Sequence, residues 1–449
     1  MSDDSEAVRA PSAAVAAMAA EWPLLDGLAG GTRAMRAAGR ALLPQFPAED
    51  DAAWRARLDA AVLTNVFARS CAVMAARPFS QAVNSARVAP AVVEWLGDID
   101  GQGTELPAFA ETLLRGCLSH GIGGVLVDFP QGAAANTRAA EKDAGLRPFW
   151  AHYPAAAILG CRADRDGGAW KLRQLRLLES VSEADGRFGE QRQEQVRVLE
   201  PGRWELWRRG DDGGWLLYET GETTLDVVPF QFFYGVRLGY GVGASPLIDL
   251  AYLNCEHWQS ASDQQTILHV ARVPILFGKG FDPAAPIRIG ASSAVVVEEA
   301  GAQLSFVEHG GHAIEAGRQS LLDLEDRMRQ LGGELLLKRP ATPTATQVAS
   351  EAEASRCLLQ SIVENFEDGL NACLGFTAQW LGEADGGRLE LFKDFGVDSL
   401  SDASAALLLD AAKAGLVSGE TFFDEMRRRS VIEAERKWGA EVERLACAD

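Results

Sequence analysis

The sequence predicts an α+β fold with several lobes, and three observations lead to that prediction. The chain has 449 residues, 47% of them hydrophobic and 24% charged, which is typical of folded soluble proteins and long enough for two to four domain-sized units or one elongated subunit. Between residues 147 and 234, apolar and polar residues alternate and D-G or G-G turns interrupt them, as in antiparallel strands. Elsewhere apolar residues recur every three or four positions, as in helices.

The N-terminal part is predicted to be an arm, then helices, then one buried strand. Residues 1–20 have few large apolar side chains, so we expect a flexible arm. Residues 35–76 follow a helical pattern. One face of this pattern carries Trp54, Leu58, Val62, Val66 and Val73. A helix over 106–119 should end at Gly121, where "GIGGVLVDFP" predicts a short buried strand before a loop at 131–146.

The sheet region gives way to a long helix after Ser245. Ser245 is a good N-cap, and Pro246 suits the first helical position, where no amide donor is needed. The following stretch of about 25 residues would form a rod of roughly 37 Å. It is less apolar than a core helix, and its second half, "QSASDQQT", is polar. Short strands are then expected within 273–308.

Three more segments complete the predicted order. A second long helix is expected over 313–331, closed by glycines that suit a C-cap. A third runs from 346 to 381 and leads to a strand at 388–393. Charged helices are expected over 399–446. Between the second and third helices lies "LLLKRPATPTATQVASEAEAS", a polar, proline-stiffened segment that does not look like core.

Charge and cysteine content limit the possible functions. The net charge is −20 and the pI is about 4.8, which argues against tight nucleic-acid binding, because such affinity comes from neutralising phosphates. The same charge suits a surface past which DNA slides without sticking. Seven cysteines without a C-x-x-C motif indicate reduced thiols and a cytosolic folding environment. The acidic N-terminus differs from a signal peptide, and no apolar run is long enough to predict a membrane span.

Four short motifs could carry chemistry, and each has a simpler interpretation. "GYGVGASP", residues 239–246, lies between a strand and a helix like a phosphate-binding loop, but Ala244 stands where a P-loop has lysine, which favours a glycine turn. His309 and His312 are too few ligands for zinc. "KDFG", residues 393–396, lacks the other kinase motifs. Cys117 and His120 are separated by a helix end, which disfavours a reactive pair. We therefore predict no enzyme, cofactor or metal.

The order of these segments resembles the portal, or head-to-tail connector, proteins of tailed bacteriophages. The blocks that carry the resemblance are "DIDGQGTELPAFAETLLRGCLSHGIGGVLVDFP", "RPFWAHYPAAAIL", "PLIDLAYLNCEHWQSASDQQTILHVARVPILFGKGF", "LEDRMRQLGGELL" with "TATQVASEAEAS", and "SGETFFDEMRRRSVI". The resemblance covers most of the chain, roughly residues 55–440. The short C-terminal part differs from portals that carry a long helical barrel.

The resemblance implies a portal fold with a wing, a two-helix stem, a small α/β clip, a tunnel loop with a long wing helix, and a short helical crown. Its implied divisions are an arm (1–20), the first part of the wing (21–244), a stem helix (245–270), the clip (271–310), a second stem helix (311–332), the tunnel loop (333–345), a long helix with the second part of the wing (346–397) and the crown (398–449).

The resemblance also implies partners and site residues. We expect a ring, usually of twelve subunits, around sequence-independent double-stranded DNA, with the terminase large subunit, the major capsid protein and a head–tail adaptor as partners. The protein would act in the virion, at the portal vertex, after assembly in the host cytoplasm, with no membrane contact. Expected tunnel-loop residues are Lys338, Arg339, Pro340, Thr342 and Thr344; expected clip residues are Phe277, Lys279, Phe281 and Arg288. The alternatives are another head-completion or capsid-associated oligomer, or a nucleotide-binding enzyme using residues 239–246.

Overall fold

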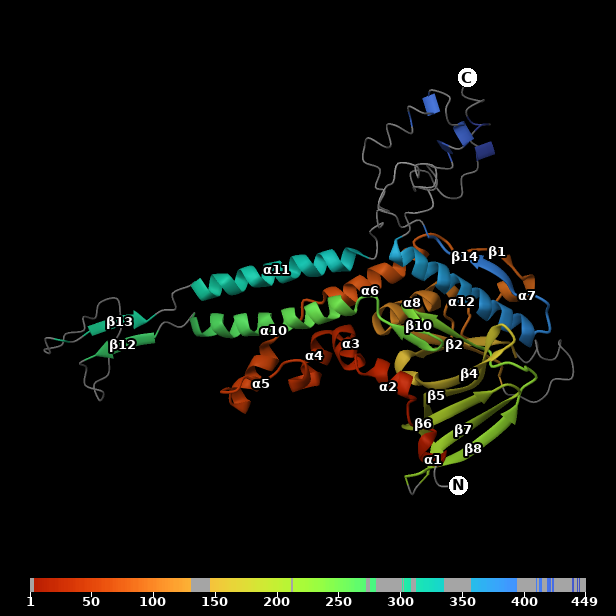
Figure 1. The fold of residues 1–449 in the computed structure, drawn as a ribbon, viewed down its shortest axis with the longest axis horizontal. Helices are drawn as coiled ribbons and strands as arrows, with labels where there is room; N and C mark the ends of the chain where they lie inside the picture. Colours follow the sequence, from red (N-terminus) through yellow and green to blue (C-terminus); the bar gives the residue numbers. More distant parts are fainter. Residues whose placement is uncertain are drawn as a thin grey trace. The chain divides into compact units, whose positions relative to one another are not determined.

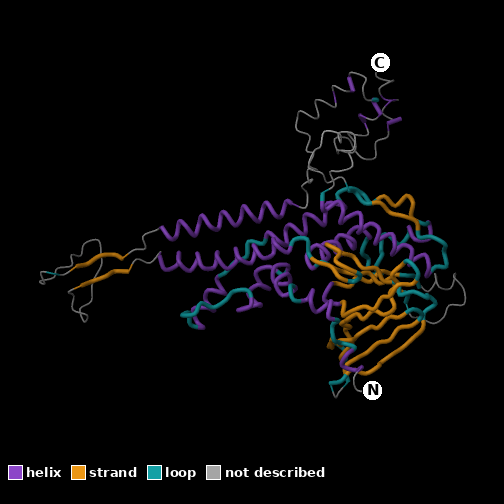
Figure 2. Tube along the Cα trace, in the orientation of Figure 1, coloured by secondary structure: helices purple, strands orange, loops and turns teal. Residues whose placement is uncertain are grey.

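The structure is a computed structural model. It describes residues 4–130, 146–210, 213–271, 275–279, 301, 303–307, 312–334 and 357–393, and a few short pieces between 409 and 444. The chain divides into two units, one of residues 1–336 with 357–395 and the other of residues 337–356 with 396–449. The first unit holds the helices and antiparallel sheets shown in Figures 1 and 2, and they confirm the predicted α+β class.

Two short helices stand where the sequence predicts a flexible arm, so that prediction is wrong for the described residues 4–20. They are α1 (Asp4–Ala7) and α2 (Ala13–Ala19). The Ser12 side chain caps α2, and the Ser12 amide donates to the Leu159 carbonyl at 2.8 Å. Arg176 donates to the carbonyls of Ala7, Val8 and Ala10. A few hydrogen bonds to the sheet thus order a segment that lacks large apolar residues.

The helical pattern over 35–76 is divided among three helices, the end of α4 (Gly31–Ala38), α5 (Asp51–Ala60) and α6 (Val66–Ala76). Helix α3 (Trp22–Ala29) precedes them. Asp50 caps α5 and Asn65 caps α6, while Ala61 between them is extended, with ψ at 135°. Because the chain turns there, the expected common face does not form, and Val62 and Val73 are exposed.

The predicted helix-to-strand transition at Gly121 is confirmed. Helix α8 (Leu106–His120) ends at Gly121, whose φ of +85° is the left-handed conformation that glycine adopts easily. Strand β2 follows at the centre of the antiparallel sheet β3–β2–β9; the bounds are β2 (Ile122–Asp128), β3 (Phe149–Pro154) and β9 (Phe230–Tyr234). Val125 faces the helical core and Leu126 faces the second sheet, as strand alternation requires.

The larger sheet has the antiparallel order β4–β5–β6–β7–β8, as the alternating pattern predicts. Its strands are β4 (Ile158–Asp166), β5 (Ala169–Asp185), β6 (Gly189–Glu200), β7 (Arg203–Arg209) and β8 (Trp215–Glu222). Leu175 and Leu177 of β5 are fully buried against Phe230 and Phe232 of β9. This apolar cluster joins the two sheets.

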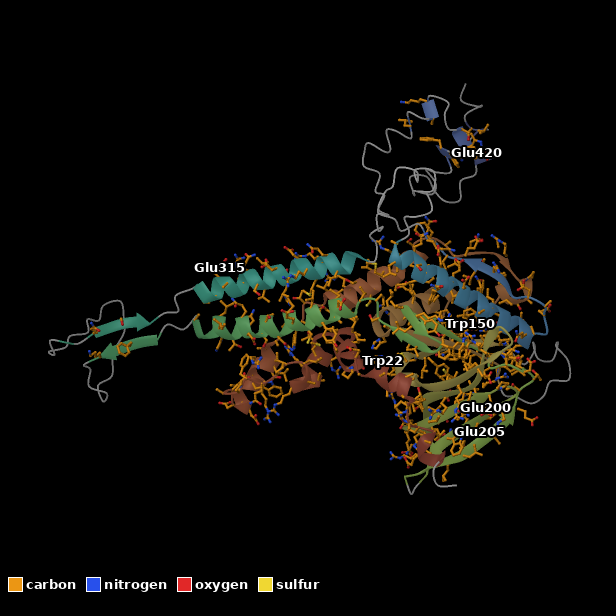
Figure 3. All side chains as sticks on the ribbon, in the orientation of Figure 1. Trp22, Trp150, Glu200, Glu205, Glu315 and Glu420 are labelled. Atoms are coloured by element: carbon orange, nitrogen blue, oxygen red, sulfur yellow. The ribbon has the colours of Figure 1, made fainter. Side chains whose placement is uncertain are left out.

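Helix α12 (Leu358–Trp380) covers the helical side of the smaller sheet. Trp150 of β3 is buried and is labelled in Figure 3. Its indole donates to the Thr377 hydroxyl of α12 at 2.9 Å. The small elements around this core are α7 (Pro90–Val93) and the strand pairs β1 (Asn84–Val88) with β14 (Gly387–Glu390) and β10 (Val236–Gly239) with β11 (Val242–Ala244). The expected start of the third long helix, 346–356, lies outside the described residues.

The second unit is described in only a few places. Phe423, which is buried, lies 5.5 Å from Trp438 between ring centroids. Most of the predicted charged helices over 399–446 lie outside the described residues, so their prediction stays a prediction.

Candidate functional site

Two long helices leave the core as an antiparallel pair, and this hairpin is the most distinctive feature of the described chain. Helix α10 (Ile248–Ala271) has 24 residues and α11 (His312–Glu334) has 23, so each is roughly 35 Å long. They run side by side, and beyond them lie β12 (Ile275–Lys279) and β13 (Gln303–Val307), which pair antiparallel (Figure 1). Both helices lie close to their predicted positions.

Asn254 fixes the core end of α10 to the start of α6. Its side chain is completely buried, and its carboxamide oxygen accepts hydrogen bonds from the amides of Val66 at 3.0 Å and Phe67 at 2.9 Å. Its amide nitrogen donates to the Thr64 carbonyl at 2.9 Å. Asn254 therefore satisfies two amides of the first turn of α6, which have no partner inside their own helix.

A buried ion pair ties the middle of α10 to the segment before α5. Arg57 Nη2 lies 2.8 Å from Glu49 Oε2, with side chains 3% and 9% exposed, and Arg57 Nη1 lies 3.4 Å from Asp263 Oδ1 of α10. The Arg57 hydrogen bond lowers the pKa of Glu49 below its usual range. Gln259 of α10 also donates to the Leu42 carbonyl at 2.9 Å.

The contact between α10 and α11 repeats every seven residues along α10, at Leu250, His257 and Gln264. Farthest from the core, the Gln264 amide donates to the Ile314 carbonyl at 2.8 Å, and a Cβ on Gly317 would lie 2.1 Å from Gln264 Oε1. The absence of a side chain at Gly317 therefore lets the helices approach closely there.

Nearer the core, the same contact is mixed in character. His257 Nε2 lies 3.6 Å from Glu325 Oε1, and a Cβ on Gly332 would lie 3.8 Å from Leu250 Cδ2 of α10 and 2.8 Å from Ser70 Oγ of α6. Three buried polar atoms of α10 have no hydrogen-bond partner: His257 Nδ1, Trp258 Nε1 and Ser262 Oγ. The buried side of this part of the hairpin is therefore partly polar.

Much of the hairpin surface stays exposed. Among the described residues of α11, only Leu324, Met328 and Gly332 are buried. The outer side carries local ion pairs, such as Arg329 with Glu325 at 2.8 Å. Large apolar side chains are also exposed: Tyr252 by 52%, Leu322 by 39% and Ile267 by 37%. A helix with a narrow buried stripe usually buries more of its surface against another chain or subunit.

Two of the expected clip residues are described. Phe277 and Lys279 lie on β12, two positions apart and therefore on the same side of the strand, and both are exposed. They pair with Ser305 and Gln303 of β13. The other expected site residues, Phe281, Arg288, Lys338, Arg339, Pro340, Thr342 and Thr344, lie outside the described residues.

The glycine-rich stretch 239–246 is a packed turn. Gly241 has a φ of +69° between β10 and β11. The Ser245 hydroxyl donates to the Leu118 carbonyl at 2.7 Å and accepts from the Leu247 amide, so it joins α8 to the segment before α10, which begins at Ile248. A Cβ on Gly243 would lie 2.3 Å from the Gly121 carbonyl oxygen. The backbone of this turn is therefore packed directly against the end of α8.

The other motifs have structural partners. Cys117 is fully buried, which raises the pKa of its thiol, and His120 bonds Ser119 and Asp26 instead. Lys393 of "KDFG" lies 2.8 Å from Glu367. His309 and the side chain of His312 lie outside the described residues. Within the described parts of the chain, six cysteines are free thiols: Cys71, Cys117, Cys161, Cys255, Cys357 and Cys373.

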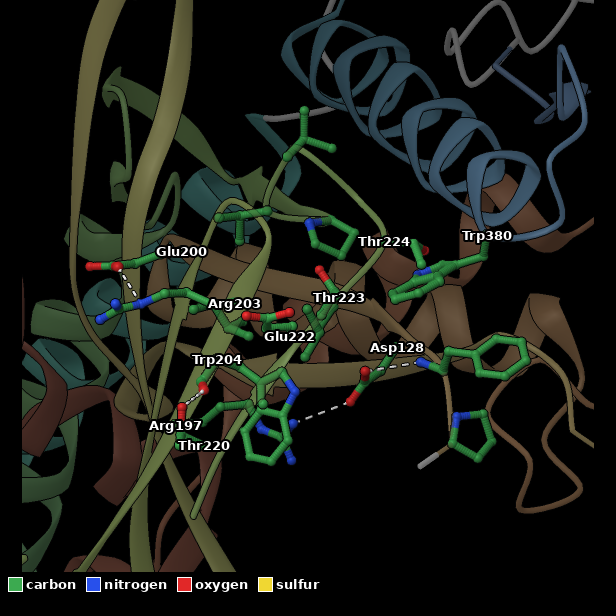
Figure 4. A pocket seen from close by; sticks show the side chains of 18 of the residues that line it. Asp128, Arg197, Glu200, Arg203, Trp204, Thr220, Glu222, Thr223, Thr224 and Trp380 are labelled. Carbon is green, nitrogen blue, oxygen red and sulfur yellow. Dashed lines mark hydrogen bonds and ion pairs between the residues drawn. The ribbon is translucent and has the colours of Figure 1, made fainter. Parts of the chain in front are cut away.

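A cavity of about 350 Å³ lies between the end of β2, strands β6–β8 and the end of α12 (Figure 4). Arg197 spans its wall, 2.7 Å from Glu179 and 3.3 Å from Asp128. Burial raises the pKa of Asp128. The indole of Trp380 donates to the Val127 carbonyl at 2.8 Å. Sequence reasoning missed this network because Arg197 and Asp128 are 69 positions apart, and no local pattern links them.

Over the parts of the chain that the structure describes, no group of three His, Cys, Asp or Glu side chains could hold a metal ion. Within the same residues, no helix has the length and hydropathy needed to cross a membrane.

Comparison with known proteins gives one family match and several structural likenesses. The model of a family described as a domain of unknown function, DUF4055, matches residues 246–381, which include both long helices. No curated protein matches the chain.

Three similar solved structures belong to gene transfer agent (GTA) particles. The neck of an empty GTA particle computed with C6 symmetry has a TM-score of 0.44 and 12% identity, covering 81% of this chain and 88% of that chain. The virion of a native GTA particle has a TM-score of 0.42 and 13% identity, and it covers the same shares of the two chains. The neck of the native GTA particle computed with C12 symmetry has a TM-score of 0.38 and 14% identity, covering 80% of this chain and 88% of that chain.

Proposed function

We propose that this chain is the subunit of a portal-type ring that forms a DNA channel at one vertex of a phage-like capsid. The observation that carries the proposal is the α10–α11 hairpin, whose surface is largely exposed to solvent in a single chain. Neighbouring copies would cover Tyr252, Ile267 and Leu322 and so surround a central channel. Exposed charge on α11 suits a surface that faces water and DNA.

In this proposal the two helices form the stem and β12–β13 form part of the clip. Phe277 and Lys279 would then belong to the surface that binds the terminase large subunit during packaging and a head–tail adaptor afterwards. Lys338 and Arg339 would line the channel in the segment between α11 and α12. Twelve copies of this weak basic pair would give appreciable contact with DNA, while the net charge of −20 would limit the total attraction.

In this proposal the chain itself would catalyse no reaction. Ser245 and Gly243 hold the glycine-rich turn against α8, which supports a structural role for residues 239–246 over nucleotide binding. The energy for moving DNA would come from the terminase. The core built on α8, β2 and α12 would serve as the wing and contact the major capsid protein.

The test is the assembly state of the purified full-length chain. Sedimentation at micromolar concentration should give one large species, with about twelve copies as the resemblance implies, and negative-stain images should show a ring with a central hole. A monomer under these conditions would contradict the proposal. A filled disc without a hole would favour another capsid-associated oligomer.

A further inference from the structure

The edge of the large sheet carries a groove lined by aromatic and basic side chains. The groove has a volume of about 550 Å³, and its lining residues are Cys161, Ala163, Trp170, Arg237, Gly239 and Tyr240. We name it the Trp170 groove. Trp170 is 51% exposed and stacks on Tyr240, with ring centroids 6.2 Å apart and planes inclined by 25°. A half-exposed tryptophan held in place by a neighbouring ring is typical of binding hot spots.

The Trp170 groove is positively charged in an otherwise acidic chain. Arg165 pairs with Trp170 across β4 and β5, and its guanidinium lies 5.6 Å from the Trp170 ring centroid. Arg237 lies in the lining, which contains no carboxylate. The groove therefore favours a partner that carries an apolar or aromatic group beside negative charge.

The other end of β5 presents a group of this kind. Residues 182–190, which we name the Phe188 arm, form the tip of the β5–β6 hairpin, and all nine of them are exposed. Phe188 at the tip is 87% exposed. Asp185 and Glu190 flank the tip on the two strands, and the Arg187 guanidinium lies 4.8 Å from the Phe188 ring centroid. Acidic residues outnumber basic ones in the arm by three to one, so its net charge is negative. An apolar ring held out in water on a two-stranded ribbon costs free energy unless something covers it.

The arm cannot reach the groove of its own chain. Trp170 is near the first residue of β5 and Asp185 is its last, so about 15 residues of extended strand, roughly 50 Å, separate them. Two complementary surfaces at opposite ends of one rigid element can meet only between different copies. Such contacts are heterologous, and repeated contacts of this kind close into a ring or run on as a filament.

We propose that the Phe188 arm of one copy inserts into the Trp170 groove of the next. Phe188 packs against Trp170 and Tyr240, while Asp185 or Glu190 lies beside Arg165 and Arg237. This inference rests on the proposed ring and adds to it a specific contact through the wing, separate from the hairpin helices.

The test uses Cys161, a native thiol that lines the groove. In a Cys447→Ser background, Phe188→Cys should form disulfides between copies under mild oxidation, giving a ladder of covalent oligomers on a non-reducing denaturing gel. Adding Cys161→Ser should abolish the ladder. Gln265→Cys, on an exposed position of α10, serves as the matched control and should form no ladder with Cys161.

Association measurements complete the test. Phe188→Ser and Trp170→Ala should each weaken self-association at least about tenfold, while their unfolding midpoints stay close to that of the unchanged protein. Rings that form equally well in both variants, with no disulfide ladder, would overturn this inference and leave the proposed ring intact. A ladder without closed rings would support the contact and contradict the ring. A wild-type chain that is monomeric and forms no ladder would overturn both.

Discussion

The carboxamide oxygen of Asn254 accepts a hydrogen bond from the Phe67 amide at 2.9 Å, although 187 residues separate the two positions. This contact joins the helix that begins the hairpin to the first turn of α6. It fixes where α10 leaves the core, and the direction of the whole hairpin depends on it.

Removing the Asn254 side chain should therefore be costly. Asn254→Ala leaves the Phe67 amide without its buried acceptor, while the Val66 amide keeps the Thr64 carbonyl at 3.1 Å, and we expect a loss of about 2 kcal/mol in the free energy of unfolding. Urea denaturation followed by circular dichroism measures this loss. Gln265→Ala on the exposed side of the same helix should change stability by less than about 0.5 kcal/mol. Equal effects of the two substitutions would contradict this role of Asn254.

The Glu49–Arg57 ion pair should make stability depend on pH in a defined direction. Because Arg57 lowers the pKa of Glu49, the pair stabilises the fold fully above the unfolded carboxyl pKa, near 4.3, and this stabilisation is lost as the pH falls through the lowered folded value. Glu49→Gln should cost about 3 kcal/mol at pH 7, since it leaves Arg57 buried beside only the more distant Asp263.

The control for this prediction is an exposed pair in the same region. Arg40 Nη2 lies 2.7 Å from Asp51 Oδ1, but the side chains are 54% and 66% exposed, so Asp51→Asn should cost less than about 1 kcal/mol. Urea unfolding of both variants from pH 3 to pH 7 separates them. An Asp51→Asn cost as large as that of Glu49→Gln, or a Glu49→Gln cost that does not shrink in acid, would refute the assignment.

Asp128 should show the opposite dependence on pH. Burial raises its pKa, so the folded protein holds this proton more tightly than the unfolded chain. As the pH rises from the unfolded value near 3.9 to the raised folded value, the wild-type protein should lose stability relative to Asp128→Asn. At pH values above the raised folded pKa, the difference in unfolding free energy between wild type and Asp128→Asn should stay constant. Unfolding free energies measured from pH 3 to pH 8 test this, and a difference that changes in the other direction would contradict it.

Gly121 and Gly103 allow backbone strain to be separated from close packing. Both have positive φ, +85° and +89°, but a Cβ on Gly121 would lie 2.4 Å from the Ala244 carbonyl carbon, whereas a Cβ on Gly103 would meet no atom within 4 Å beyond its chain neighbours. Gly103→Ala should cost about 1 kcal/mol, because alanine disfavours this conformation. Gly121→Ala should cost at least about 3 kcal/mol, since the backbone before α10 must also move. Thermal unfolding compares them, and equal costs would contradict the packing argument.

Local patterns predict much of this fold. Helix α8, its glycine end and strand β2 were predictable because each depends on neighbouring residues, and the five-stranded sheet follows from alternation and turns. The break between α4 and α5 also has a sequence signal, the prolines Pro44 and Pro47, which cannot continue a helix.

Contacts between distant residues could not be predicted in this way. The order of residues 4–20 depends on Arg176, and the position of α10 depends on Thr64, Val66 and Phe67 meeting Asn254. In each case, the sequence of one segment contains no feature that identifies the distant segment it contacts. The hairpin helices were predictable from periodicity, but the groove at Trp170 required the register of β4 with β5 and the placement of β10–β11.

The side-chain hydrogen bonds and ion pairs that bind α10 to the preceding helices all fall, among the described residues, between Tyr252, which bonds Glu21, and Asp263. The hairpin is therefore held along the half nearest the core, and its far half makes no such bonds among the described residues. A beam held in this way deflects most at its unsupported end, so β12 and β13 follow the motion of whatever they touch. A sideways load there becomes torque about Asn254, and these bonds pass that torque to α5 and α6.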